Sequence, residues 1–144
     1  MLTCTRRLTF EAGHRVMGHE NKCAHLHGHS YKVWLTAEAT GLDSVGRVVD
    51  FSVLKELVGG WIDWQWDHGF LLHEKYAAAL VAVKSFQTEH GEQKVYLLDG
   101  NPTAENLAWH LLKEVCPRLL IRADVKIVRV VVQETENCSA EASL

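Results

Sequence analysis

The sequence has no excess of positive charge, no long apolar run and no pair of closely spaced cysteines, and each absence excludes a class of protein. A formal net charge of -3 argues against nucleic-acid binding, because domains with that function are usually basic. No segment stays apolar over the ~20 residues that a membrane span needs. Polar residues 3 to 7 stand where the apolar part of a signal peptide would begin. We therefore expect a cytoplasmic protein that binds neither nucleic acid nor membrane.

The sequence also lacks internal repeats, low-complexity tracts and recognisable linkers. Its 144 residues, of which 47% are hydrophobic and 23% charged, predict one globular domain over residues 1 to 144. The four cysteines, Cys4, Cys23, Cys116 and Cys138, show no CxxC spacing. In a reducing compartment we expect them to be free thiols.

Histidine, in contrast, is abundant: the chain has 9, and four of them fall within residues 19 to 29. Residues 3 to 14 and 27 to 39 alternate in a way typical of strands with one buried face. The more apolar faces carry His14 on the first strand, and His27 and His29 on the second. If the strands pair antiparallel, these three imidazoles approach one another. They then leave one position of a tetrahedral zinc ion open, as in catalytic zinc sites.

Other interpretations of this cluster stay open at the level of sequence. Cys23 can complete the tetrahedron as a fourth ligand, which would make the zinc structural, since one cysteine with three histidines is an accepted ligand set. His25 shares the strand face of His27 and His29 and can replace either of them. His19, on the intervening loop, is a weaker candidate.

The remaining sequence predicts an α+β fold with an antiparallel sheet. A stripe of apolar residues predicts a helix over residues 51 to 65, and a shorter helix is expected over 74 to 88, ending near Gly91. Residues 95 to 98 can form a short strand. Asn101 and Pro102 are typical of an N-cap and the first helical position, and Pro117 is expected to end that helix. The β-branched residues 125 to 133 predict a strand covered on both faces.

Two further places in the sequence can support chemistry. Asp67 and His68 can act as one acid–base unit only on an irregular turn, which Gly69 permits; a solvated surface pair is the alternative. Glu134 ends an apolar strand face, so it either lies in solvent or binds a partner such as the adjacent N–H and amino groups of a heterocycle. Glu105 falls in the first turn of a predicted helix, where a carboxylate complements the helix dipole.

Six segments, in the same order, resemble those of the 6-pyruvoyl-tetrahydropterin synthase / 6-carboxy-tetrahydropterin synthase family. They are Phe10-Glu11-Ala12-Gly13-His14, Cys23-x-x-x-His27-Gly28-His29, Val49-Asp50-Phe51-Ser52-x-Leu54-Lys55, Asp67-His68, Asn101-Pro102-Thr103-Ala104-Glu105-Asn106-Leu107-Ala108 and Glu134-Thr135.

The resemblance implies the tunnelling fold, in which helices cover one face of an antiparallel sheet. Subunits of that fold join their sheets into an oligomeric barrel, as a trimer or as a homohexamer made of two trimers. The implied site residues are the zinc ligands His14, His27 and His29, the catalytic Cys23, Asp67 and His68, and the pterin-binding Glu134 with its neighbours Glu105 and Thr103. In this family Asp67 and His68 would often act across a subunit interface.

The three residues between Cys23 and His27 resemble the bacterial 6-carboxy-tetrahydropterin synthases of the queuosine, or 7-deazaguanine, pathway. The implied activity is that of a zinc-dependent lyase. It would convert 7,8-dihydroneopterin triphosphate to 6-carboxy-5,6,7,8-tetrahydropterin, acetaldehyde and triphosphate. The alternatives are a 6-pyruvoyl-tetrahydropterin synthase, which eliminates triphosphate, and a non-catalytic zinc- or pterin-binding module. The stretch from Tyr76 to Gln93 is longer than in the shortest relatives, and the sequence assigns it no role.

Overall fold

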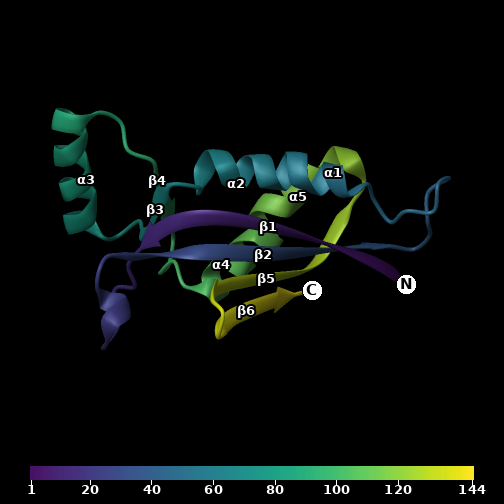
Figure 1. The fold of residues 1–144 in the computed structure, drawn as a ribbon, viewed down its shortest axis with the longest axis horizontal. Coiled ribbons are helices and arrows are strands. Elements are labelled where there is room, and N and C mark those ends of the chain that lie inside the picture. The colour runs from purple at the N-terminus through teal and green to yellow at the C-terminus, as the bar shows by residue number, and fades with distance from the viewer.

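The computed structural model describes residues 1–144, which form one six-stranded sheet with helices packed against it (Figure 1). The strands are β1 (Leu2–His14), β2 (His27–Ala39), β3 (Gly69–His73), β4 (Val95–Leu98), β5 (Lys126–Thr135) and β6 (Cys138–Ser143). The helical segments are η1 (Lys22–Ala24), α1 (Phe51–Leu54), η2 (Lys55–Gly59), α2 (Gly60–Gln65), α3 (Ala77–His90), α4 (Ala104–His110), η3 (Leu111–Val115), α5 (Cys116–Leu120) and η4 (Ile121–Ala123).

The two long N-terminal strands form the antiparallel pair that the alternating pattern predicted. Their register runs without a shift from Leu2 opposite Ala39 to His14 opposite His27. Side chains on one face of a strand recur every second residue, so this register places the face that carries His14 level with the face that carries His27 and His29. The antiparallel pairing that brings His14 to His27 and His29 is therefore confirmed.

The sheet has the order β4-β3-β1-β2-β5-β6 and is mixed, whereas the sequence predicted an antiparallel sheet. Strands β1, β2, β5 and β6 are antiparallel, as expected. The short strand β3 instead pairs parallel with β1, and β4 pairs parallel with β3. The physical reason is the helical crossover from residue 51 to residue 65, which returns the chain so that β3 enters the sheet in the direction of β1.

The core lies between one face of the sheet and the helices α1 to α2 and α4 to α5 (Figure 1). Tyr31, Val33 and Leu35 from β2 are fully buried there, together with Leu107 and Leu111 from the C-terminal helix. Helix α3 lies apart, at the end of the molecule beside β3 and β4 (Figure 1). The histidines of β1 and β2 thus continue the buried row of the sheet toward that end.

The helix predicted over residues 51 to 65 is present, although its middle turn, η2, is a π-helix. Gly59 lies on it against β1, where a Cβ atom would meet Leu8 Cδ2 at 3.2 Å. This close approach explains why a poor helix former is tolerated there. The second predicted helix is also present, as α3, and ends at Gly91 with a positive φ of 88°.

The C-terminal helix differs from its prediction at both ends. Its N-cap is Thr103, whose hydroxyl accepts the Asn106 amide at 3.3 Å, so the helix begins two residues later than Asn101 and Pro102 suggested. It also continues past Pro117 to Leu120. The π turn η3 ends two residues before the proline and, being wider than an α turn, lets the helix pass a residue that cannot donate a hydrogen bond.

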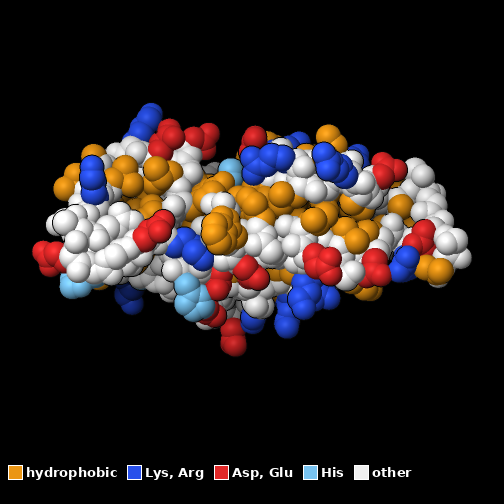
Figure 2. All heavy atoms as spheres, turned by 90° about the horizontal axis from the view of Figure 1, so that it is seen from above, with side chains coloured by type: hydrophobic (Ala, Val, Ile, Leu, Met, Phe, Trp, Pro, Cys, Tyr) orange, Lys and Arg blue, Asp and Glu red, His pale blue; other side chains and the backbone are white.

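No helix of the structure has both the length and the apolar character that crossing a membrane requires. Seen from above, hydrophobic side chains gather in a band along the middle of the molecule, bordered by charged side chains (Figure 2).

Candidate functional site

Three histidine side chains meet at the end of the buried row of the sheet. The ligand atoms of His14, His27 and His29 all lie within 4.8 Å of one another, and this group includes neither Cys23 nor His25. His14 is 1% exposed, and the side chain of His29 is 16% exposed. A half-buried set of three nitrogen ligands, open on one side, can bind a metal ion such as zinc.

Backbone carbonyl groups fix the orientation of two of these rings. His14 Nδ1 donates to the carbonyl oxygen of Pro102 at 2.7 Å, and His27 Nδ1 donates to the carbonyl oxygen of His25 at 2.7 Å. A neutral imidazole that carries its proton on Nδ1 presents a lone pair at Nε2. A hydrogen bond from the ring nitrogen that does not bind the metal, here Nδ1, typically orients a metal-ligating histidine. His25 therefore contributes its backbone to the site, while its side chain is exposed.

The Nε2 atoms of the three histidines suit binding of a cation better than hydrogen bonding to one another. His14 Nε2 and His27 Nε2 lie 3.0 Å apart, and both present lone pairs if each Nδ1 is protonated. His29 Nε2 is buried and has no hydrogen-bond partner. Burial is the main reason that the pKa of His14 falls to about 4, so that ring is neutral near pH 7. Neutral imidazoles with unpaired lone pairs are the donor set that zinc prefers.

Glu134, at the end of β5, lies directly beside the three histidines. Its carboxylate oxygens are 4.0 Å from His14 Nε2 and 3.9 Å from His29 Nε2. Burial, and then the charge of Glu105, raise the pKa of Glu134 above its usual value, while His27 opposes the shift. The alternative of a solvated strand end is therefore not supported, and a partly buried carboxylate faces the cluster.

Tyr31 adds a polar group that the sequence did not reveal. It is fully buried, two residues beyond His29 on the same face of β2, and its hydroxyl has no hydrogen-bond partner. Burial raises its pKa, and the charges of Glu134 and Cys23 raise it further. A tyrosine in an apolar strand pattern resembles a core residue, so no sequence signal distinguished it.

Cys23 lies on η1 within the loop that joins β1 to β2, and it forms no disulfide. The Val16 amide donates to the Cys23 carbonyl oxygen at 2.9 Å, which closes the loop near its base. The thiol does not belong to the group of close ligand atoms, so the geometry does not support a closed site of one cysteine and three histidines. Cys23 is partly exposed, so its thiol is accessible to small molecules.

Asp67 and His68 form the irregular turn that the sequence required of them. His68 has a φ of 59°, in the left-handed region, and its Nδ1 lies 2.6 Å from Asp67 Oδ2. Partial burial opposes the charge of Asp67, but the Glu11 amide at 2.8 Å and the His68 ring hold its pKa below the usual value. The carboxylate therefore fixes the orientation of the ring, as an acid–base unit would require.

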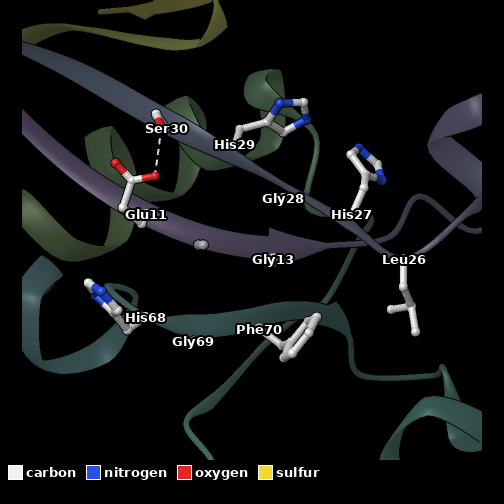
Figure 3. A pocket seen from close by; sticks show the side chains of 11 residues that line it. Glu11, Gly13, Leu26, His27, Gly28, His29, Ser30, His68, Gly69 and Phe70 are labelled. Atoms are coloured by element: carbon white, nitrogen blue, oxygen red, sulfur yellow. Dashed lines mark hydrogen bonds between the residues drawn. The ribbon is translucent and has the colours of Figure 1, made fainter.

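The same turn directs His68 away from the three histidines of its own chain. The His68 side chain is 78% exposed. Strand β1 lies between β3, which follows His68, and β2, which carries His27 and His29 (Figure 3). A pocket of about 520 Å³ crosses these strands and is lined by both His27 and His68, with Gly13 and Gly28 at its floor (Figure 3). Of the pair, His68 lines this pocket, whereas neither Asp67 nor Cys23 does.

The two remaining predicted residues stand on α4. Thr103 accepts the Asn106 amide as the N-cap, and Glu105 is exposed in the first turn. Glu105 is close enough to Glu134 to raise its pKa. Sequence reasoning missed Asn101 as a positioning residue, because it resembled an N-cap. Its amide instead pairs with both backbone groups of Met17, at 2.9 Å each.

Comparison with known proteins decides the family. The model of the family described as 6-pyruvoyl tetrahydropterin synthase matches residues 3–143. The chain belongs to the 6-pyruvoyl tetrahydropterin synthase family. A relative from Rickettsia bellii, named 6-carboxy-5,6,7,8-tetrahydropterin synthase, is 43% identical over 98% of this chain and 99% of its own length. A protein of the same name from Aquifex aeolicus is 30% identical over 95% of this chain and 94% of its own length.

Solved structures share the fold of this family member. A structure from Wolinella succinogenes, described as an uncharacterized protein, superposes with a TM-score of 0.83 at 24% identity and covers 99% of this chain and 97% of its own. The Caenorhabditis elegans 6-pyruvoyl tetrahydropterin synthase superposes with a TM-score of 0.65 at 19% identity and covers 99% of this chain and 95% of its own. The α+β fold expected from the family resemblance is thereby confirmed.

Proposed function

We propose that this protein is a zinc-dependent 6-carboxy-5,6,7,8-tetrahydropterin synthase that acts on 7,8-dihydroneopterin triphosphate. The observation that carries the proposal is the group formed by His14, His27 and His29, with the partly exposed Cys23 on the adjoining loop. The chain is similar, over 98% of its length, to relatives named 6-carboxy-5,6,7,8-tetrahydropterin synthase, which supports this reaction over that of the 6-pyruvoyl enzyme of the same fold. The queuosine pathway and a cytoplasmic location are part of the proposal.

The chemistry follows from the residues around the cluster. Zinc held by the three histidines would supply a Lewis acid that lowers the pKa of hydroxyl groups on the substrate side chain. Cys23 serves as the base that removes a proton from a neighbouring carbon. Asp67 holds His68 in one tautomer, so that this ring can carry the proton of a second transfer.

Glu134 binds the pterin ring in this proposal, with Glu105 and Thr103 as neighbours. A carboxylate can accept two hydrogen bonds from a ring N–H and the adjacent amino group. The Glu134 carboxylate lies 4.0 Å from His14 Nε2 and 3.9 Å from His29 Nε2. A pterin ring bound to Glu134 would therefore place the substrate's side chain at the cluster. The rest of the proposed site thus depends on Glu134 for orientation.

Glu134→Gln is expected to weaken binding of the pterin substrate by roughly ten- to a hundredfold, because it removes hydrogen bonds to a charged group. Zinc content, measured by elemental analysis, is expected to stay at the wild-type level. Glu136→Gln, an exposed carboxylate just beyond β5, is the matched control and should leave both quantities unchanged. An unchanged pterin affinity in Glu134→Gln would contradict the anchoring role.

A homo-oligomer, as a trimer or a pair of trimers, is part of the same proposal. Residues 2 to 10 of β1 have no strand partner on the side of β3, so a free strand edge runs along the molecule up to Glu11, which bonds to Asp67 and His68. Such edges pair readily with other strands. Phe70, Val81, Phe86 and Leu97 are large exposed hydrophobic side chains on β3, α3 and β4, which also favours association. Association would let His68 face the cluster of a neighbouring copy.

The deciding experiment incubates the zinc-loaded protein with 7,8-dihydroneopterin triphosphate and identifies the products by mass spectrometry. 6-Carboxy-tetrahydropterin with acetaldehyde supports the proposal, while 6-pyruvoyl-tetrahydropterin would keep the site and change the reaction. Cys23→Ala, with its zinc retained, is the control and should abolish turnover. Full activity in that variant would overturn the role of Cys23, and no turnover by the wild type would leave a zinc- or pterin-binding module.

A further inference from the structure

The loop that carries Cys23 is held by hydrogen bonds and not by the core. No residue from Arg15 to Leu26 is buried, so burial of apolar side chains does not fix the position of the thiol. A loop without such anchoring would open readily by local fluctuation. Something else must therefore hold Cys23 at a defined distance from His14.

The backbone at Cys23 and Ala24 is held by hydrogen bonds from the two residues that follow His14. The Val16 amide donates to the Cys23 carbonyl oxygen at 2.9 Å. The Arg15 side chain donates through Nε to the carbonyl oxygen of Ala24. Consecutive carbonyl groups of the loop are thus tied to the residues adjoining a proposed metal ligand. A shift of Arg15 would move the thiol relative to the cluster.

The arginine itself is held by the segment that had no assigned role. The Arg15 guanidinium lies 4.4 Å from the centroid of the Tyr76 ring, over its face. Tyr76 is the N-cap residue of α3, at the start of the stretch from residue 76 to residue 93. An aromatic face attracts a guanidinium group and limits its rotamers. Arg15 forms no ion pair with a carboxylate, and its guanidinium contacts the Tyr76 ring and the Ala24 carbonyl oxygen.

We propose that Arg15 is a positioning residue for Cys23, and that the α3 segment stabilises it there through the ring of Tyr76. The inference rests on the proposed function, because it takes Cys23 to be the reacting base. The inference concerns geometry. The guanidinium of Arg15, the residue next to His14, sets the distance between the Cys23 thiol and the three histidines. Misplacement of a reacting group by ~1 Å can lower a rate by about a hundredfold, so such a residue acts on turnover without contacting the substrate.

The test uses the zinc-loaded full-length protein and the variant Arg15→Met, which keeps the length of the side chain and removes the donor and the charge. Hydrogen exchange of the peptide that spans residues 15 to 26, followed by mass spectrometry, reports opening of the loop. We expect exchange about tenfold faster than in the wild type, which corresponds to ~1.4 kcal/mol of lost local stability. We expect kcat for 7,8-dihydroneopterin triphosphate to fall by about tenfold or more with KM and zinc content unchanged.

Three further variants make the result specific. Tyr76→Leu removes the aromatic face and should change exchange and kcat in the same direction by a smaller factor, whereas Tyr76→Phe keeps the face and should behave as the wild type. Arg122→Met makes the same chemical change at an exposed arginine on η4 and is the matched control. If Arg15→Met does not fold, Tyr76→Leu decides the question by the same two measurements.

Wild-type exchange in Arg15→Met would overturn the inference. So would a rise in KM with kcat unchanged, which would mean that Arg15 contacts the substrate. Hydrogen exchange needs no turnover, so the positioning of the loop is decided even if the protein does not convert the pterin. Cys23→Ala in the same assay separates the two failures. If it abolishes turnover while Arg15→Met matches the wild type, the proposed function stands and the positioning role falls.

Discussion

At the residue scale, the contrast between His25 and His27 defines the candidate metal centre. The two side chains are two positions apart in a regular alternation, so sequence could not separate them. Structure separates them by a single hydrogen bond, in which the His25 carbonyl accepts from His27 Nδ1. That contact uses the backbone of one residue to orient the ring of the other. The His25 side chain is left in solvent.

His27→Ala is therefore expected to lose zinc and turnover together, because two imidazoles bind zinc far more weakly than three. His25→Ala is the matched control and should retain both, since alanine keeps the carbonyl that orients His27. Zinc per chain, determined by elemental analysis after dialysis, checks both variants. A full complement of zinc in His27→Ala would move the ligand role to another residue.

A second histidine outside the cluster links stability to pH. His110 on α4 lies 2.8 Å from the Tyr96 hydroxyl, with its ring among the aromatic side chains of Trp61 and Trp66. Burial lowers the pKa of His110, although the charges of Glu114 and Asp99 oppose the shift.

Because the folded-state pKa lies below the unfolded value of 6.5, His110 contributes stability that is fully present above pH 6.5. That contribution is lost as pH falls, since the unfolded chain binds the proton first. We expect His110→Gln to flatten the decline of the unfolding free energy of the zinc-loaded protein below pH 6.5. Urea titrations at several pH values measure it, and parallel curves for variant and wild type would contradict the assignment.

At the scale of elements, Gly28 lets β1 and β2 approach closely where the histidines stand. Gly13 pairs with Gly28, between His27 and His29. A Cβ atom on Gly28 would lie 2.9 Å from the carbonyl oxygen of Ala12, a backbone atom that cannot move without displacing the strand. The glycine is thus required by the separation of the strands and not by an unusual φ.

Gly28→Ala should destabilise the fold by about 1–3 kcal/mol, as overpacked sites do, and should weaken zinc binding because the neighbouring rings shift. Gly41→Ala is the control, since no atom lies within 4 Å of a Cβ atom built there. Thermal unfolding with and without zinc measures both effects. Equal stability of the two variants would show that the strands adjust without cost.

The elements also show how far the sequence could predict this structure. Strong local patterns gave the two long strands, the helix over residues 51 to 65 and the strand over residues 95 to 98. Strands β3 and β6 were missed because their sequences are short and contain few β-branched residues. They form strands because they pair with β1 and β5. Pro117 misled because a π turn, invisible in the sequence, carries the helix past it.

For the candidate site, alternation brought His14, His27 and His29 together, and the family resemblance assigned roles to Cys23 and Glu134, which the residue pattern had already singled out. The groups that hold them could not be predicted in the same way. Pro102 and Asn101 act through contacts that span more than 80 residues of sequence, with separations of 88 and 84. Such contacts depend on tertiary packing, which no local pattern records.

At the scale of the whole molecule, the acid–base pair and the thiol of one chain stand apart. The exposed His68 and the partly exposed Cys23 both border surfaces that a neighbouring copy can cover. If sites form between copies, a chain that lacks one group can be complemented by a chain that lacks the other.

We therefore expect that Cys23→Ala and His68→Ala, each inactive alone, regain part of the wild-type turnover when they are unfolded and refolded together. Mixed oligomers then contain some sites with both groups intact. Mass measurement in solution verifies that mixed species form, and each variant refolded by itself is the control. Mixed oligomers without activity would indicate that the two groups act within a single chain.

The hydrogen bond from His14 to the Pro102 carbonyl has a consequence for the order in which the protein matures. During synthesis the three histidines leave the ribosome early, but the group that orients the first of them is translated much later. A nascent chain that has not yet reached Pro102 lacks the acceptor that aims His14 at the other two. The fully oriented set of three nitrogen ligands is therefore complete only after Pro102 has been translated, when most of the polypeptide already exists.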